Sequence, residues 1–194
     1  MLLERLKRTP GPVGACCNQP VLSLMVFSLS ADDALCRAIA EGLNADASIY
    51  AAMGAFAANE SRPLQNLVYG RRTDPHRLLA DAPRQFNQFL DGDFGAVRYE
   101  KTAERGGRIV WDNPAESYLS YCLTSLGYFV RLLENSGVAG VTAHNRECRA
   151  GGGTRCIWEF GWSAVTDSRR STQSLRAVQL DEKSELPPPG PLLP

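Results

Sequence analysis

The stretch that decides the fold is ECRAGGGTRC, residues 147–156. It places Cys148 and Cys156 on the two sides of a turn rich in glycine, and glycine adopts the backbone angles of a tight turn at little cost. The flanking segments, 141–148 and 155–162, are interpreted as the strands of a β-hairpin. We therefore expect the turn to bring two thiols within reach of one ion.

A third cysteine lies on the helix that precedes this hairpin. The helix is predicted over about 114–135, and Cys122 belongs to its apolar face. Because that face packs against a neighbouring element, we expect the helix to lie over the hairpin and to carry Cys122 to Cys148 and Cys156. Three thiolates suit Zn²⁺. The alternative is that the three cysteines act only as small apolar core residues.

The identity of the fourth metal ligand stays open at this point. Strand alternation places His144 on the same face as Cys148, and Asn145 and Glu147 on the other face. Histidine and glutamate are common zinc ligands, whereas asparagine is a poor one. His144, Glu147 and a water molecule are therefore the candidates.

The remaining sequence predicts an α+β domain. Capping signals and apolar spacing predict four or five helices before residue 92, and alternation in 96–101 and 108–111 predicts a first hairpin. A helical N-terminal part, a hairpin, a long helix and a second hairpin together predict one antiparallel sheet. The apolar faces predicted for the first three helices are Leu35, Ile39 and Leu43; Ile49, Met53 and Phe56; and Leu64, Leu67 and Val68.

Proline and glycine set the predicted domain boundaries. Residues 1–20 are interrupted by both and lack periodicity, so we expect a flexible N-terminal segment. The domain is predicted over 21–164. Residues 165–194 are rich in serine and arginine and end in a proline run, which predicts a disordered tail.

Composition argues against several classes of partner. Lys+Arg and Asp+Glu both total 21 in this chain of 194 residues, so there is no electrostatic reason to expect nucleic-acid or membrane-surface binding. The longest apolar run, 21–29, is far shorter than the roughly 20 residues that span a bilayer. The chain has six cysteines, but it is long enough to form a core without disulfide bonds. We therefore expect a cytoplasmic protein whose thiols are free or bound to metal.

The pattern Cys-Arg-Ala-x-Gly-x-x-x-Cys, after a helix that contains Gly-Tyr, resembles the 4-vinyl reductase domain family. The resemblance is tightest over 117–162 and extends to element order over 35–112. It implies a small-molecule-binding domain related in fold to haem–nitric-oxide sensor domains and to Golgi transport subunits. It also implies a structural zinc on Cys122, Cys148 and Cys156 with a glutamate, whose position is Asn145 in this chain.

The resemblance further implies a pocket for a hydrophobic or aromatic molecule between the helices and the sheet. The residues it suggests as pocket lining are aromatic: Phe86, Phe89, Tyr99, Trp111, Tyr121 and Phe129. The simpler interpretation of each is an ordinary core residue.

The function expected from these features is a non-enzymatic regulatory domain that signals through a partner protein or a homodimer. The alternatives are an interaction subunit of the same fold without a ligand, an accessory factor in tetrapyrrole reduction, and a redox sensor that uses Cys148 and Cys156. Haem is not expected, because His76 is the only histidine predicted on a helix and the chain lacks the Tyr-x-Ser-x-Arg motif that the haem–nitric-oxide sensors use.

Overall fold

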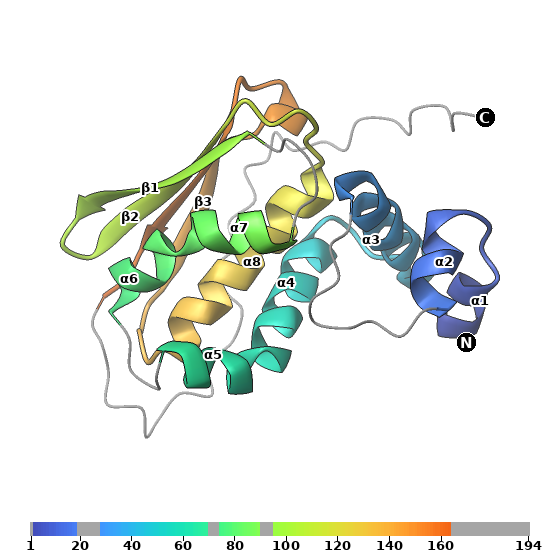
Figure 1. The fold of residues 1–194 in the computed structure, drawn as a ribbon, viewed down its shortest axis with the longest axis horizontal. Coiled ribbons are helices and arrows are strands. Elements are labelled where there is room, and N and C mark those ends of the chain that lie inside the picture. The colour runs from blue at the N-terminus through green and yellow to red at the C-terminus, as the bar shows by residue number, and fades with distance from the viewer. Residues whose placement is uncertain (1, 19–27, 70–73, 90–94, 164–194) are drawn as a thin grey trace.

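The computed structural model describes residues 2–18, 28–69, 74–89 and 95–163, and it confirms the α+β fold (Figure 1). The helices are α1 (Leu2–Lys7), α2 (Pro12–Asn18), α3 (Leu29–Leu43), α4 (Ser48–Glu60), α5 (Arg62–Tyr69), α6 (Pro75–Ala80), α7 (Ala82–Phe89) and α8 (Leu119–Asn135). The strands are β1 (Ala96–Ala103), β2 (Gly106–Asp112), β3 (Thr142–Glu147) and β4 (Cys156–Gly161), and a 3-10 turn, η1, covers Arg149–Gly151.

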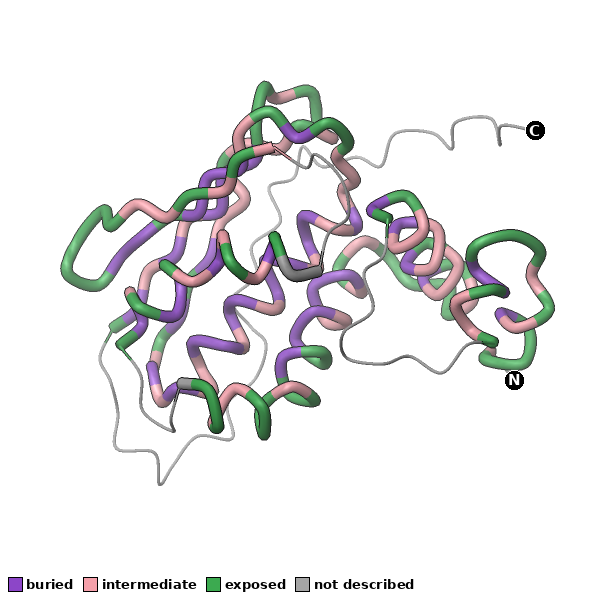
Figure 2. The backbone as a smooth tube through the Cα atoms, in the orientation of Figure 1, coloured by how far each residue is buried: buried purple, intermediate pink, exposed green. Residues whose placement is uncertain are grey.

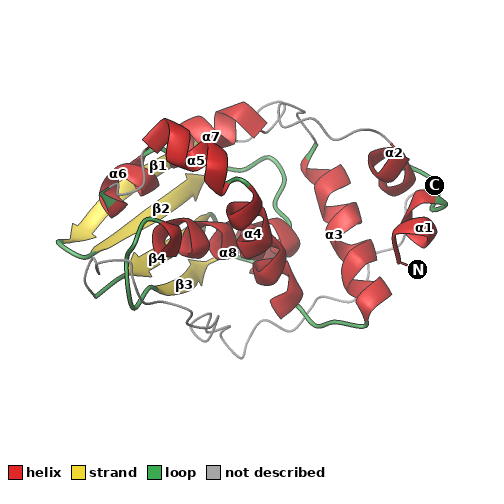
Figure 3. Cartoon of the chain, turned by 90° about the horizontal axis from the view of Figure 1, so that it is seen from below, coloured by secondary structure: helices red, strands yellow, loops and turns green. Residues whose placement is uncertain are grey.

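The four strands form one antiparallel sheet in the order β1-β2-β4-β3. Each hairpin pairs internally, and β2 pairs with β4 so that Trp111 lies opposite Cys156. Helices α6, α7 and α8 lie over one face of this sheet (Figure 3). Successive side chains of a strand point to opposite faces, so one face of the sheet forms the core with the helices.

The other face of the sheet carries a lattice of ion pairs. Arg98 pairs with both Glu100 and Asp112, and Arg108 also pairs with Glu100. Such exposed pairs contribute little to stability individually. Val110 and Ile157 lie beside Arg98 on this face and are buried, so the face combines exposed ion pairs with apolar side chains.

Helix α8 is the centre of the core, and most of its length is buried (Figure 2). One of its faces packs on the sheet, and the other packs on α4. The helices α4 and α8 approach closely because glycines face each other's backbone: a Cβ added at Gly127 would lie 2.0 Å from the carbonyl oxygen of Ala51, and one added at Gly54 would lie 1.8 Å from that of Thr124.

Several large apolar residues of the predicted helix faces are exposed. Phe56 is 66% exposed and Leu67 is 82% exposed, and Leu43, Leu64 and Val68 are also exposed. Helix α4 instead buries Tyr50 and the small residues Ala51, Gly54, Ala55 and Ala58. Small side chains permit backbone contact, which the spacing of large apolar residues does not reveal.

The N-terminal segment also differs from expectation. Residues 2–18, predicted to be flexible, form α1 and α2, with Leu6 and Val13 buried. The predicted tail, 165–194, lies outside the described residues. Among the described helices, none combines the length and apolar character needed to cross a membrane.

Candidate metal centre and aromatic core

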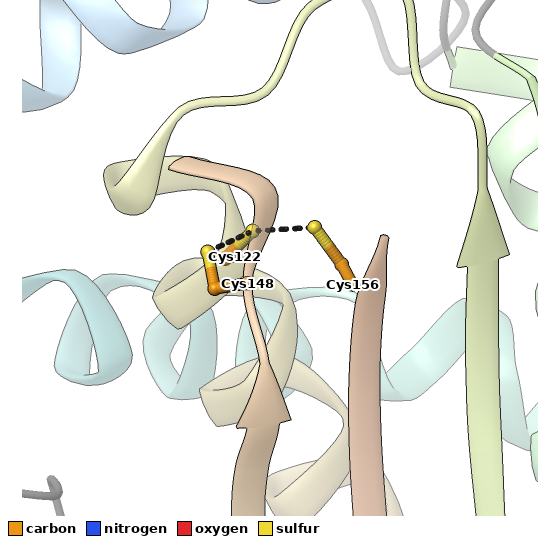
Figure 4. A group of neighbouring side chains, drawn as sticks. All are labelled: Cys122, Cys148 and Cys156. Carbon is orange, nitrogen blue, oxygen red and sulfur yellow. Dashed lines mark hydrogen bonds between the residues drawn. The ribbon is translucent and has the colours of Figure 1, made fainter. Parts of the chain in front are cut away.

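Three thiols meet where the start of α8 lies beside the turn of the second hairpin (Figure 4). The Sγ atom of Cys122 lies 3.5 Å from that of Cys148 and 3.5 Å from that of Cys156, and all three sulfurs lie within 4.8 Å of one another. Cys122 and Cys156 are fully buried, and Cys148 is partly buried. The structure thus brings together the three cysteines that the sequence singled out.

The chain between Cys148 and Cys156 is folded to hold this geometry. The carbonyl oxygen of Cys148 accepts hydrogen bonds from the N–H groups of Gly151 and Gly153, at 3.0 and 2.9 Å. Gly152 ends η1 with a φ of 92°, a left-handed conformation that favours glycine. The turn therefore requires glycine at 152 for its backbone angle and at 153, where a Cβ would lie 3.0 Å from the carbonyl oxygen of Cys148, whereas Gly151 has room for a side chain.

The three thiols ionise unequally. The hydrogen bonds that Cys148 shares with Cys122 and Cys156, together with the backbone N–H groups of Gly151 and Ala150, lower the pKa of Cys148 to about 3. Hydrogen bonds with Cys148 and Cys156, and then burial, raise the pKa of Cys122 well above its usual value. One thiolate forms readily, and its charge opposes ionisation of the next. A bound divalent cation would remove that opposition.

Neither of the two proposed fourth ligands joins the three thiols. The Oε1 atom of Glu147 accepts from the backbone N–H of Thr154 at 2.8 Å and from its hydroxyl at 2.9 Å, and Oε2 lies 3.3 Å from Nε of Arg155. These contacts lower the pKa of Glu147 and close the hairpin turn. His144 lies opposite Glu159 in the sheet. Among the described residues, the metal-ligating group contains neither of them.

Asn145 and Ser117 have different surroundings. Asn145, at the position where the resemblance expects glutamate, pairs with Trp158 across the strands, and its buried Oδ1 atom has no hydrogen-bond partner among the described residues. Ser117, which the sequence analysis did not single out, places its Oγ atom 3.5 Å from Sγ of Cys156 and 3.9 Å from Sγ of Cys122. A serine outside any metal-binding motif gives no signal in sequence.

Three of the predicted ligand-lining aromatics form a cluster beside the thiols. Phe86 meets Trp111 edge-on at a centroid distance of 5.6 Å and Tyr121 at 6.0 Å, and Trp111 lies 5.7 Å from Tyr121. Trp158 joins this cluster, 5.9 Å from Phe86, although the sequence analysis did not select it. Trp158 is fully buried, and its indole N–H has no hydrogen-bond partner within the described ranges of the chain.

The other predicted aromatics lie apart from this cluster. Phe129 packs on Tyr128 and Phe160 further along α8. The hydroxyl of Tyr99 is hydrogen-bonded to Nδ1 of His76. Phe89 is the last residue of α7, and its side chain lies outside the described part of the structure. The single pocket lined by all six residues therefore stays a prediction.

Comparisons with known proteins give a likeness of fold. No family model matches the chain, and no curated protein matches it. An H-NOX protein from Shewanella oneidensis in the Fe(II) ligation state superposes with a TM-score of 0.63 at 14% identity, over 86% of each chain. An H-NOX protein from S. oneidensis in the Fe(II)NO ligation state gives a TM-score of 0.61 at 14% identity, over 84% of this chain and 87% of the other. An H-NOX protein from K. algicida gives 0.54 at 11%, over 84% and 93%.

The residues present do not fit a haem held by a helical histidine. Both ring nitrogens of His76 are engaged, Nδ1 with the hydroxyl of Tyr99 and Nε2 with the carbonyl oxygen of Glu104 at 2.7 Å. Because that carbonyl can only accept, Nε2 carries the proton. His144, the other histidine of the chain, lies on β3 opposite Glu159. The chain thus has the fold of the H-NOX proteins, while its one helical imidazole has no nitrogen left for iron.

Proposed function

We propose that this chain is a non-enzymatic regulatory domain that binds a small hydrophobic or aromatic molecule and is braced by a structural zinc ion. Cys122, Cys148 and Cys156 would hold the ion. The domain would act in the cytoplasm and pass its signal to a partner protein or to a second copy of itself. The observation that carries the proposal is the convergence of three sulfurs from α8 and the two sides of the hairpin turn.

The chemistry of the donors supports zinc. Soft thiolates select zinc over magnesium or calcium, which prefer oxygen. Zinc bound here supplies positive charge that stabilises the thiolates, and it crosslinks the start of α8 to the turn between β3 and β4. The two hairpin cysteines are eight residues apart, whereas Cys122 is more distant in sequence, so the link joins two separate elements.

The core beside the thiols supports binding of a small molecule. Ligand sites combine apolar walls with a few convergent polar groups. The cluster of Phe86, Trp111, Tyr121 and Trp158 is aromatic, and the indole N–H of Trp158 is a buried donor without a partner among the described residues. A ligand with a hydrogen-bond acceptor would satisfy that donor. The structural neighbours include an H-NOX protein with bound NO, so this fold accommodates small ligands in other proteins.

A second candidate function is an interaction subunit without a ligand. The same aromatic rings favour it, because Phe86, Trp111 and Tyr121 contact one another directly and already form a packed core. Native mass spectrometry of the freshly purified chain separates the two. An organic molecule retained at one per chain supports the regulatory domain, and its absence together with a stable complex with a protein partner supports the interaction subunit.

The zinc is tested by metal analysis of protein purified under reducing conditions. We expect one zinc per chain, and we expect Cys148→Ser to lose most of it. The double variant Cys16→Ser/Cys17→Ser is the matched control, because those partly buried thiols belong to α2 and are absent from the three-thiol group. Zinc at only a small fraction of one per chain in the unmodified protein would refute the metal centre.

A further inference from the structure

We propose that the hydroxyl of Ser117 is the fourth donor of the metal centre, so that the site has three sulfur ligands and one oxygen. This inference rests on the proposed zinc. The sequence leaves His144, Glu147 and a water molecule as candidates for this donor, and Ser117 is a residue that no motif identifies.

The distances fit a tetrahedral site. With Zn–S near 2.3 Å and Zn–O near 2.1 Å, tetrahedral angles place two sulfurs about 3.8 Å apart and a sulfur and an oxygen about 3.6 Å apart. The Sγ atom of Cys122 lies 3.5 Å from each of the other two sulfurs, and Oγ of Ser117 lies 3.5 and 3.9 Å from Cys156 and Cys122. Ser117 therefore lies at the spacing expected of a shared metal ion from two of the three sulfurs, those of Cys122 and Cys156.

The local backbone explains how Ser117 reaches this position. The long helix was predicted from about residue 114, but α8 begins at Leu119, after Tyr118 in an extended conformation. The N–H of Cys122 donates to the carbonyl oxygen of Tyr118 at 3.0 Å. Ser117 therefore precedes the first turn of the helix, and its side chain can turn back toward Cys122. Ser117 and Cys122 would thus both bind the metal from the N-terminal end of α8.

The competing donors are less suitable. Both carboxylate oxygens of Glu147 are held by Thr154 and Arg155, and His144 lies opposite Glu159. The Oδ1 atom of Asn145 is buried but makes no hydrogen bond to any described residue, the thiols included. Among these residues, Ser117 is the one whose oxygen contacts the sulfurs, at 3.5 Å from Cys156 and 3.9 Å from Cys122.

A neutral hydroxyl is a weaker ligand than a thiolate or a carboxylate. A site completed by Ser117 is therefore expected to exchange its fourth ligand and its metal more readily than one with four strong ligands, which is the character of an open rather than a closed zinc site. The rate of metal exchange therefore depends on Ser117 if its hydroxyl is a ligand, and does not depend on it if the hydroxyl is only structural.

The test is cobalt substitution of the full chain, because the visible absorption of Co²⁺ reports the number and type of its ligands. Ser117→Ala should shift the visible bands and weaken metal binding by about tenfold or more in competition with a chromophoric chelator. Ser117→Cys should tighten binding and give the spectrum of a site with four thiolates. Ser30→Ala, an exposed serine at the start of α3, is the control.

Asn145→Glu separates the two possible positions of the fourth donor. If Ser117 occupies the vertex, this variant should leave the cobalt spectrum unchanged. Unchanged binding in Ser117→Ala, combined with tighter binding in Asn145→Glu, would overturn the serine and leave the zinc centre standing. Absence of cobalt or zinc binding in the unmodified chain would instead overturn the centre itself. Far-UV circular dichroism of each variant confirms that it folds.

Discussion

At the scale of single residues, the burial of Asp32 makes the stability of the domain depend on pH. Burial, and then the charge of neighbouring Asp33, raise the pKa of Asp32 from 3.8 to about 6. The folded state therefore binds its proton more tightly than the unfolded state, so Asp32 lowers stability progressively as the pH rises from about 4 to 6. We expect Asp32→Asn to raise the free energy of unfolding at pH 7.5, by at most about 3 kcal/mol, and to have little effect at pH 4.

Urea denaturation at the two pH values measures this difference. Asp46→Asn is the opposing control, because hydrogen bonds from Ser48 lower the pKa of Asp46, and its loss should reduce stability at neutral pH. A difference between Asp32→Asn and the unmodified chain that does not change with pH would contradict the assignment.

The indole of Trp158 carries a second prediction at this scale. A buried donor without a partner costs about 1–3 kcal/mol, so removing it offsets part of the packing lost in Trp158→Phe. In ligand-free protein we expect this variant to be destabilised less than Phe129→Leu, which removes buried surface from the same core without removing a polar atom. Thermal unfolding compares them. A larger loss in Trp158→Phe would show that the N–H has a partner in solution.

Single residues also show how far the sequence leads. Cysteine chemistry and glycine turns are specific enough that the amino-acid pattern alone places Cys122, Cys148 and Cys156 together. Glu147 and Ser117 could not be assigned in this way, because their roles depend on which atoms the turn directs toward them. Glu147 faces the N–H groups of its own hairpin, and Ser117 faces two sulfurs.

At the scale of elements, the crossing of α4 and α8 is set by two glycines. A methyl group at Gly127 would meet the backbone oxygen of Ala51, which cannot rotate away. We therefore expect Gly127→Ala to lower the free energy of unfolding by at least about 2 kcal/mol. Gly42→Ala is the matched helical control, because its methyl group would meet only the side-chain ends of Leu2 and Arg5. Equal stability of the two variants would contradict a close crossing.

The same crossing shows what periodicity predicts and what it does not. The strands are predicted within two residues and the end of the long helix is predicted correctly, because alternation and apolar spacing follow directly from their geometry, but the helix begins at Leu119 rather than near residue 114. The predicted face of α4 is right in part: Ile49 and Met53 pack against the core, but Phe56 is exposed, and the buried Ala51 and Ala55 give no signal in the spacing of large apolar residues. Contact through small residues is a property of two helices together.

At the scale of the whole molecule, two separate packing systems stabilise the domain. One joins α8 to α4 through small residues, and the other joins α8 to the sheet through the aromatic core. The three thiols belong to the second system, at the end of the sheet where β3 leads into η1 and β4 begins. Removal of a bound zinc should therefore loosen the hairpin turn while leaving the crossing of α4 and α8 in place.

Hydrogen–deuterium exchange measures this local effect. After treatment with a zinc chelator under reducing conditions, we expect faster exchange in 147–156 and in the first turn of α8, and unchanged exchange in the middle of α4. Cys148→Ser should already exchange rapidly at the turn and should not respond to the chelator. Equal acceleration throughout the domain would mean that the metal supports the entire fold. No acceleration at the turn would mean that zinc does not stabilise the turn.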